Sequence, residues 1–322
     1  MSERKHILVT EQTGYDLIGD IHGHGDALEQ LLLKLGYQDS GAGFCHPTRK
    51  VIFLGDFIDR GEHLRQHRKV LGIVMPMVAS GAALAVMGNH EFNALAYHTF
   101  HNGDYLRKHT PNNQRQHQAF LNEFDDEPEL KAEVLAFFYQ LPLWLEVDGI
   151  RVVHACWDQA CIDKLDKLLT DQRLLPEHLV ESSTDGSYLF FAVERLLKGV
   201  EVSLPEGIVF HDKDGHERHA IRVQWWRSDA ENLGEVALPL GVDIESATGL
   251  PIPKDVPTYQ PDLPACFMGH YWWQGKPAPL APNIACLDYS VAKGGPLVAY
   301  RWQGEQVLCS EHFVSWKDDT EI

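Results

Sequence analysis

Three short stretches decide the fold of this chain: GDIHGHG at 19–25, GDFIDRG at 55–61 and GNHE at 88–91. Each directly follows an apolar run, and these runs are YDLI at 15–18, KVIFL at 50–54 and AALAVM at 82–87. Glycine recurs in the three stretches because only glycine lets the backbone turn tightly and pass close to a bound ion. The pattern predicts that polar side chains gather where successive β-strands end.

The apolar runs alternate with helical patterns. Leucines at 28, 31, 32 and 35 follow the first stretch at helical spacing, and a second helix is predicted across Leu64–Ser80. Repeated strand–loop–helix units are typical of an α/β fold with a largely parallel sheet covered by helices. In such sheets ligands bind at the carboxyl ends of the strands, which is where the three stretches lie.

The remaining sequence predicts one domain, 1–322, with two additions. LPLWLEV and IRVVHA form a hairpin that turns at Asp148-Gly149, and a second hairpin near the end turns at Gly294-Gly295. Residues 157–200 have a helical pattern, and we expect 157–225 to form a cap insertion over the site. Residues 238–264 are rich in proline and glycine and predict a long surface loop.

The ligand chemistry of the three stretches indicates a metal site. They contain carboxylate, amide and imidazole groups but no thiolate, at Asp20, His22, Asp56, Asn89 and His90. Such ligands suit manganese, iron or zinc, and a carboxylate shared by two ions is the usual basis of a two-metal hydrolytic site. The residues therefore predict a binuclear metallophosphatase.

GDIHG, GDFIDRG and GNHE resemble the motifs of the calcineurin-like metallophosphoesterases, in the bacterial type of the phosphoprotein phosphatase (serine/threonine phosphatase-like) branch. HA at 154–155, GH at 269–270 and LDYSVAKGGPLVAY at 287–300 extend the similarity. The resemblance implies two packed mixed β-sheets flanked by helices, an α/β/β/α sandwich. It also implies two divalent metal ions as cofactors, with manganese as the first choice and iron or zinc as alternatives.

The resemblance also implies roles for single residues. Asp20 and His22 would hold the first ion, and Asp56 would bridge both ions. The second ion would be completed by Asn89, His154 and His270. A neutral amide beside two imidazoles leaves that ion less charge-compensated, which helps it to polarise a phosphoryl oxygen.

A second group of residues would act on the substrate. His90 follows a metal ligand directly and would protonate the leaving group as general acid, while Asp59 would orient its imidazole. Arg60 would bind the phosphate through its planar guanidinium. Arg227, which follows QWW, resembles the family's second phosphate arginine, and Arg222 is its rival.

We expect an enzyme that hydrolyses phosphate monoesters by in-line attack of a metal-bridging hydroxide. Phosphoserine or phosphothreonine on proteins is the first substrate class. The alternative is a dinucleoside polyphosphate hydrolase or phosphodiesterase, whose familiar members tend to carry Asn where this chain has Asp59. A third hypothesis, from another class, is a non-catalytic metal-binding scaffold.

Composition limits the partners. The chain has 46 acidic and 28 basic residues and a formal charge of −18, which disfavours a nucleic-acid duplex as partner. The first 13 residues are polar, and no apolar run approaches the roughly 18 residues of a membrane span, so we expect a cytoplasmic protein without membrane contact. Six cysteines without a CxxC pair are expected to be reduced.

Two sets of eye-catching side chains have simpler interpretations. We predict that the histidines of the polar stretch after the third motif are solvated, namely His98, His101, His109 and His117. Tryptophans flank two of the proposed site segments, and core packing is expected for at least two of them, which are Trp225, Trp226, Trp272 and Trp273.

Overall fold

A computed structural model describes residues 14–60, 64, 66–206, 209–211, 217–238 and 249–317. Its first β-sheet has the strand order β18-β17-β1-β4-β5. The predicted parallel part consists of β1 (Gly14–Ile18), β4 (Arg49–Phe53) and β5 (Ala83–Ala85). Two strands from the end of the chain, β17 (Leu297–Trp302) and β18 (Phe313–Trp316), add to it in antiparallel pairing, so the sheet is mixed.

The second sheet is also mixed and has the order β16-β15-β9-β8. β8 (Trp144–Val147) and β9 (Ile150–Val153) form the predicted hairpin, with Asp148 and Gly149 in the turn at positive φ. β15 (Ala265–Met268) lies parallel to β9, and β16 (Ile284–Cys286) lies parallel to β15.

One core cluster joins the two sheets. Side chains of alternate strand residues contribute to it, because successive residues of a strand point to opposite faces. Leu17 and Ile52 come from the first sheet, and Val152 and Phe267 come from the second, all fully buried. The fold is therefore the two-sheet sandwich that the motifs imply.

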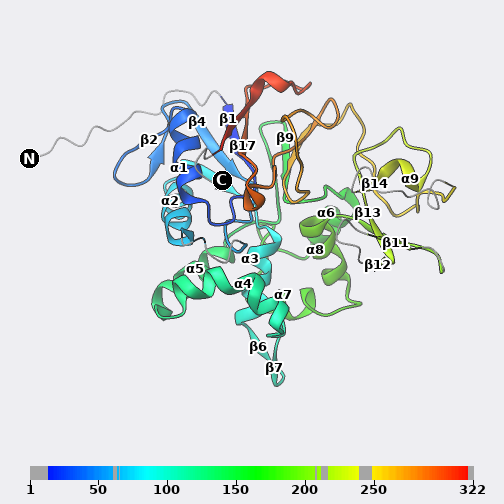
Figure 1. Ribbon diagram of the computed structural model, residues 1–322, viewed down its shortest axis with the longest axis horizontal. Coiled ribbons are helices and arrows are strands. Elements are labelled where there is room, and N and C mark those ends of the chain that lie inside the picture. Colours follow the sequence, from blue (N-terminus) through cyan, green and yellow to red (C-terminus); the bar gives the residue numbers. More distant parts are fainter. Residues whose placement is uncertain are drawn as a thin grey trace, which may run out of the picture.

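Helices cover the outer faces (Figure 1). α1 (Gly25–Lys34) contacts β17 and β18, and α2 (His67–Ala79) contacts β5. The predicted Leu64–Ser80 helix thus begins a few residues later. Other helices follow along the chain, and these are α3 (Asn89–His98), α4 (Pro111–Phe124), α5 (Pro128–Phe138), α6 (Gln159–Leu165), α7 (Pro176–Ser182), α8 (Tyr188–Lys198) and α9 (Leu233–Val236).

Segment 157–225 contains α6, α7 and α8 and then the first two strands of a small antiparallel sheet with the order β10-β13-β14. Within 249–264, the described part of the proline-rich segment, the chain forms no helix or strand. The short strands are β10 (Glu201–Ser203), β13 (Ala220–Val223), β14 (Ala237–Leu238), β11 (Phe210–His211), β12 (Glu217–Arg218), β2 (Gln38–Asp39), β3 (Phe44–Cys45), β6 (Phe100–His101) and β7 (Asp104–Tyr105).

The hairpin predicted at Gly294-Gly295 is wrong. β16 belongs to the second sheet and β17 to the first, so the chain crosses between sheets there through the short 3₁₀ helix η2 (Val291–Lys293). A glycine pair between two apolar runs predicts a turn, but it does not specify which strand each run pairs with.

None of the six cysteines, all within the described residues, forms a disulfide. Across the described ranges, we find no helix with the length and apolar character needed to cross a bilayer.

Candidate metal centre

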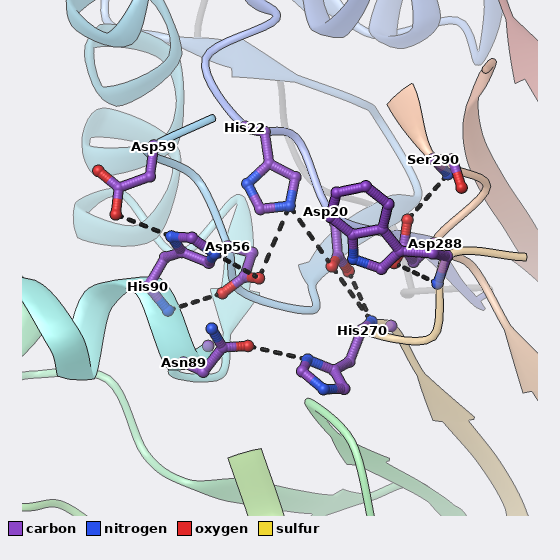
Figure 2. A network of polar contacts seen from close by, with 12 residues as sticks. Asp20, His22, Asp56, Asp59, Asn89, His90, His270, Asp288 and Ser290 are labelled. Atoms are coloured by element: carbon purple, nitrogen blue, oxygen red, sulfur yellow. Dashed lines mark hydrogen bonds and ion pairs between the residues drawn. The ribbon is translucent and has the colours of Figure 1, made fainter. Parts of the chain in front are cut away.

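The proposed ligands meet at the carboxyl ends of the strands from both sheets (Figure 2). Asp20 follows β1, and Asp56 follows β4. Asn89 is the first residue of α3, after β5. The second sheet contributes His154 directly after β9 and His270 shortly after β15. All of these side chains are buried.

The loops that carry the ligands have an unusual backbone. His22, Asp56 and His270 have φ values of 46°, 52° and 70°, a region that non-glycine residues rarely adopt and that clusters at functional sites. Close packing explains one motif glycine, since a Cβ on Gly88 would lie 2.3 Å from Asp56 Oδ1. Only glycine fits there because the carboxylate occupies the space of a side chain.

His22 presents a lone pair to two carboxylates. Its Nδ1 donates a hydrogen bond to the Ile58 carbonyl at 3.0 Å, so its Nε2 is an acceptor when the ring is neutral. That Nε2 lies 3.7 Å from Asp56 Oδ2 and 3.9 Å from Asp20 Oδ2. Burial lowers the pKa of His22 to about 3, which keeps the ring neutral. Acceptors that face one another in this way fit a cation between them.

A similar arrangement occurs on the other side of Asp56. His154 Nδ1 donates to the Leu54 carbonyl at 2.7 Å, and its Nε2 lies 3.4 Å from Asp56 Oδ2 and 3.2 Å from Asn89 Oδ1. His270 Nδ1 lies 2.8 Å from Asn89 Oδ1. Two ligand groups thus share Asp56, one with His22 and His90 and one with His154 and His270, each with ligand atoms within 4.8 Å of one another.

The electrostatics also fit bound cations. Burial and the neighbouring Asp288 carboxylate raise the pKa of Asp20 well above its usual range. Burial also acts to raise the pKa of Asp56, but the charges of His154 and His90 outweigh it and lower this pKa. Nε2 of both His22 and His270 is buried without a hydrogen-bond partner. These donors and charges match two divalent cations that share Asp56.

His90 and Asp59 form the predicted pair. The His90 backbone N–H donates to Asp56 Oδ1 at 2.9 Å, which ties the helix start to the shared carboxylate. His90 Nδ1 donates to Asp59 Oδ2 at 2.7 Å, and its Nε2 lies 4.0 Å from Asp56 Oδ2, as Figure 2 shows. The free nitrogen of His90 therefore faces the centre, which is compatible with a general acid and also with a further ligand.

The charges of two arginines act on the proposed ligands, that of Arg60 on His22 and that of Arg222 on His270. Arg60 and Arg222 each have a buried Nε without a hydrogen-bond partner. The Arg60 guanidinium lies over the Trp272 ring, 4.8 Å from its centroid. Burial lowers the pKa of His270, and the charge of Arg222 is the next largest cause. Arg222 also forms an ion pair with Glu201 at 3.3 Å, with its side chain 35% exposed. Arg227 forms an ion pair with Asp229 at 2.8 Å, with its side chain 36% exposed.

Two carboxylates that the sequence did not single out hold the loops. Glu91, the last residue of GNHE, accepts hydrogen bonds from the backbone N–H groups of Asp56 and Phe57 and from that of Gly88. Asp288 accepts from the backbone N–H groups of Trp272 and Ser290. Both carboxylates lie inside motifs that carry the family resemblance. Their positions beside glycine-rich turns were the sequence signal for a structural role.

The prediction that the histidines after the third motif are solvated is wrong for His117, which is 3% exposed and bonds to Asp59. Helical spacing was the sequence signal for this burial, because His117, Phe120 and Phe124 share one face of α4 and all three are buried. His101 is exposed as predicted. Trp225 and Trp226 are buried in the core, also as predicted.

Known proteins resemble this chain in sequence. The sequence pattern of the calcineurin-like phosphoesterases matches residues 15–192. The asymmetrical bis(5'-nucleosyl)-tetraphosphatase PrpE of Oceanobacillus iheyensis is 32% identical over 155 residues, 47% of this chain and 60% of that protein. PrpE of Bacillus cereus is 32% identical over 182 residues, 54% of this chain and 70% of that protein.

A solved structure supports the same fold. The serine/threonine phosphatase from Saccharomyces cerevisiae with similarity to human phosphatase PP5 aligns with a TM-score of 0.50 and 13% identity, over 98% of this chain and 85% of that one. About half of the sequence therefore matches one family. This half includes the motifs that carry the proposed ligands before His270, and the fold agrees with that family. The chain belongs to the calcineurin-like phosphoesterases.

Proposed function

We propose that this enzyme hydrolyses dinucleoside polyphosphates. The observation that carries the proposal is the 32% identity to B. cereus PrpE, whose name assigns it bis(5'-nucleosyl)-tetraphosphatase activity, over 70% of that protein's length. This reverses the order of the two substrate classes that the motifs favoured. The Asp at position 59, which argued against a dinucleotide substrate, lies within the stretch that the family pattern covers.

We propose that Asp20, His22 and Asp56 hold one ion, and that Asp56 also holds the second with Asn89, His154 and His270. Manganese is the proposed metal, with iron or zinc as alternatives, because the ligands are oxygen and imidazole. Divalent ions bound there supply Lewis acidity toward phosphoryl oxygens and lower the pKa of water.

The chain's own residues would bind and protonate the substrate. Arg60 and Arg222, whose charges act on His22 and His270 respectively, would bind phosphate oxygens through their guanidinium N–H groups. His90 would hold a proton on its Nε2 and give it to the leaving oxygen. Asp59 would keep the ring in place through the 2.7 Å bond to Nδ1.

A cluster beside Arg60 suits an extended substrate. Lys293 Nζ lies 4.0 Å from the centroid of the Trp272 ring, the same indole that contacts Arg60. Two cations on one indole offer charge for further phosphates and an aromatic face for a base. A small monoester would not reach both. We expect Lys293→Ala to lower kcat/KM for diadenosine tetraphosphate more than for an aryl phosphate.

We also propose that segment 157–225 covers the centre. Arg222 of β13 influences the pKa of His270, and Trp225 Nε1, at the end of this segment, donates to the Ala155 carbonyl next to His154. Both observations support a cap whose second half lies beside the second ligand group.

A second candidate is a phosphomonoesterase, including a phosphoserine or phosphothreonine phosphatase. The buried His90–Asp59 pair favours it. An alkoxide leaving group needs a proton in the transition state, whereas a nucleotide phosphate leaves readily without one.

The test is a comparison of kcat/KM at saturating Mn²⁺ for diadenosine tetraphosphate, 4-nitrophenyl phosphate, a phosphoserine peptide and bis(4-nitrophenyl) phosphate. We expect the dinucleotide to be preferred by at least about tenfold, which corresponds to about 1.4 kcal/mol. A tenfold preference for the monoesters would replace the proposal with the second candidate. Absence of turnover with metal bound would favour the scaffold hypothesis. Asp56→Asn, prepared in parallel, controls for contaminating phosphatases.

A further inference from the structure

His117 lies in the middle of α4 and is almost completely buried, with 3% of its surface exposed. Its ring stacks on Phe120, with centroids 4.7 Å apart and the planes 17° from parallel. A buried imidazole needs partners for its ring nitrogens, because an unpaired buried polar group destabilises the fold. Both nitrogens of His117 have such partners.

The first partner is Asp59. His117 Nδ1 lies 2.8 Å from Asp59 Oδ1, while His90 Nδ1 lies 2.7 Å from Asp59 Oδ2. A carboxylate has only acceptors, so both imidazoles donate to it. Burial acts to raise the pKa of Asp59, but His117 and His90 outweigh it and hold this pKa below its usual range, so the group stays ionised.

The second partner is His98, at the end of α3. Its Nε2 lies 3.1 Å from His117 Nε2. A neutral His117 that donates from Nδ1 accepts at Nε2, and in that tautomer His98 is the donor. Burial lowers the pKa of His98 to about 4, so this ring is neutral and carries its proton on Nε2. In this tautomer the N–H groups of His98 and His117 both point toward the Asp59 carboxylate.

This geometry constrains the carboxylate. If His90 were the only donor to it, the Asp59 carboxylate could rotate about its terminal torsion. The hydrogen-bonded His90 ring would then move as well. Donors on both oxygens fix its plane, and a fixed plane sets where His90 Nε2 points. Outer partners of this kind orient catalytic imidazoles in many sites.

We propose that His117 is a positioning residue for the reaction, which fixes Asp59 and through it His90, and that His98 holds His117 in the required tautomer. The proposal rests on the role of His90 as general acid proposed above. It assigns a function to α4 and α3 that no motif in the sequence indicates.

The test uses variants that separate the hydrogen bond from the packing. His117→Phe keeps an aromatic ring against Phe120 but removes the donor to Asp59. His117→Asn removes the ring but keeps an amide N–H near the position of Nδ1. His109→Ala is the matched control, because it removes an imidazole that stacks on Tyr97 at 3.8 Å and bonds to the Tyr97 carbonyl.

Each variant is assayed with phenyl phosphate, which has a poor leaving group, and with 4-nitrophenyl phosphate, which has a good one. We expect His117→Phe to lower kcat for phenyl phosphate by about 10–100-fold, the usual cost of losing an outer partner, with a smaller loss for 4-nitrophenyl phosphate. His117→Asn should recover most of this activity, and His109→Ala should match the wild type. Bound metal should not change.

A double-mutant cycle separates this proposal from the one on which it rests. In the His90→Ala background His117→Phe should have no further effect, because both act through one proton transfer. An unchanged kcat in His117→Phe, or an additive loss in the double variant, would overturn the inference. If His90→Ala alone lowers kcat equally for both esters, the general-acid role itself fails. Should His117→Phe not fold, His117→Gln, whose amide lies nearer to Nε2, must show the same selective loss.

Discussion

Asp56 has the most crowded position of any residue in the centre. Its Oδ2 lies 3.4 Å from His154 Nε2, 3.7 Å from His22 Nε2 and 4.0 Å from His90 Nε2. Its Oδ1 accepts from the His90 backbone, and its own N–H donates to Glu91. One carboxylate thus links both ligand groups to the helix that carries Asn89. Few other residues could make these contacts at a positive φ.

Arg222, rather than Arg227, is expected to be the second phosphate arginine. Arg222 pairs with Glu201 at 3.3 Å much as Arg227 pairs with Asp229, but of the two only Arg222 acts on the pKa of His270 and has a buried Nε without a hydrogen-bond partner. We expect Arg222→Ala to lower kcat/KM by an amount equivalent to about 2–4 kcal/mol, the range for one preorganised donor. Steady-state kinetics of both alanine variants decide this. The assignment is reversed if only Arg227→Ala is impaired.

The placement of residues was predictable where a motif carried them. The strand-end placement of Asp20, Asp56 and Asn89 could be expected from GD and GNH after apolar runs. The contact of His117 with Asp59 could not, because the two residues are 58 positions apart; helical spacing signals only the burial of His117. The choice between Arg222 and Arg227 depended on the direction of side chains around a short strand, which sequence spacing does not specify.

At the scale of elements, α4 holds the N-terminus of α2, which follows the loop of the second motif. Glu123 accepts hydrogen bonds from the backbone N–H groups of His67 and Arg68 at 2.9 and 3.0 Å and from His67 Nδ1 at 2.8 Å. A carboxylate at this end of a helix satisfies orphan donors and complements the helix dipole. The neighbouring Arg68 and Lys69 are ion-paired with acidic side chains.

We expect Glu123→Gln to lower the free energy of unfolding by about 1–3 kcal/mol, because it replaces a charged acceptor with an amide that has only one acceptor atom. Denaturant unfolding measures this. Glu127→Gln is the matched control, since Glu127 bonds to Arg68 from an exposed position and its loss should cost less than about 1 kcal/mol. Equal effects of both variants would contradict the capping role.

The same group predicts a dependence on pH. Burial acts to raise the pKa of Glu123, but its bonds with His67 and Arg68 outweigh it and lower this pKa. A depressed pKa contributes stability that is present above the unfolded value, about 4.3, and is lost as the pH falls through the folded value. Wild type and Glu123→Gln should therefore converge in stability as the pH falls below about 4. A constant difference between pH 7 and pH 3 would show that this carboxylate is not the cause.

Element types were more predictable than pairings. The parallel β1-β4-β5 set and the β8-β9 hairpin are confirmed because local apolar runs and a nearby turn specify them. The path after β16 was not predictable, because β17 pairs with β1 across almost the whole length of the chain. Such pairing depends on the packing of the two sheets, and no local signal carries it.

At the scale of the whole molecule, two sheets packed face to face bring together ligands from distant parts of the chain. The loops after β1, β4 and β5 come from one sheet, and those after β9 and β15 come from the other. The set proposed for the first ion comes from loops of the first sheet, whereas the set for the second ion needs loops of both sheets. Figure 1 shows the two sheets side by side, with α3 to α5 below the first and α6 and α8 beside the second.

We propose that hydrolysis depends on two divalent ions that share Asp56. The most direct measurement is the metal content and the phosphohydrolase activity of the same samples of wild type and Asp56→Asn, after chelation and after reloading with Mn²⁺. We expect the reloaded wild type to bind two ions per chain and to recover its activity, and Asp56→Asn to lose most of its metal and nearly all turnover. Asp56→Asn with two bound ions and near-normal turnover, or full activity in the chelated wild type, would contradict the account.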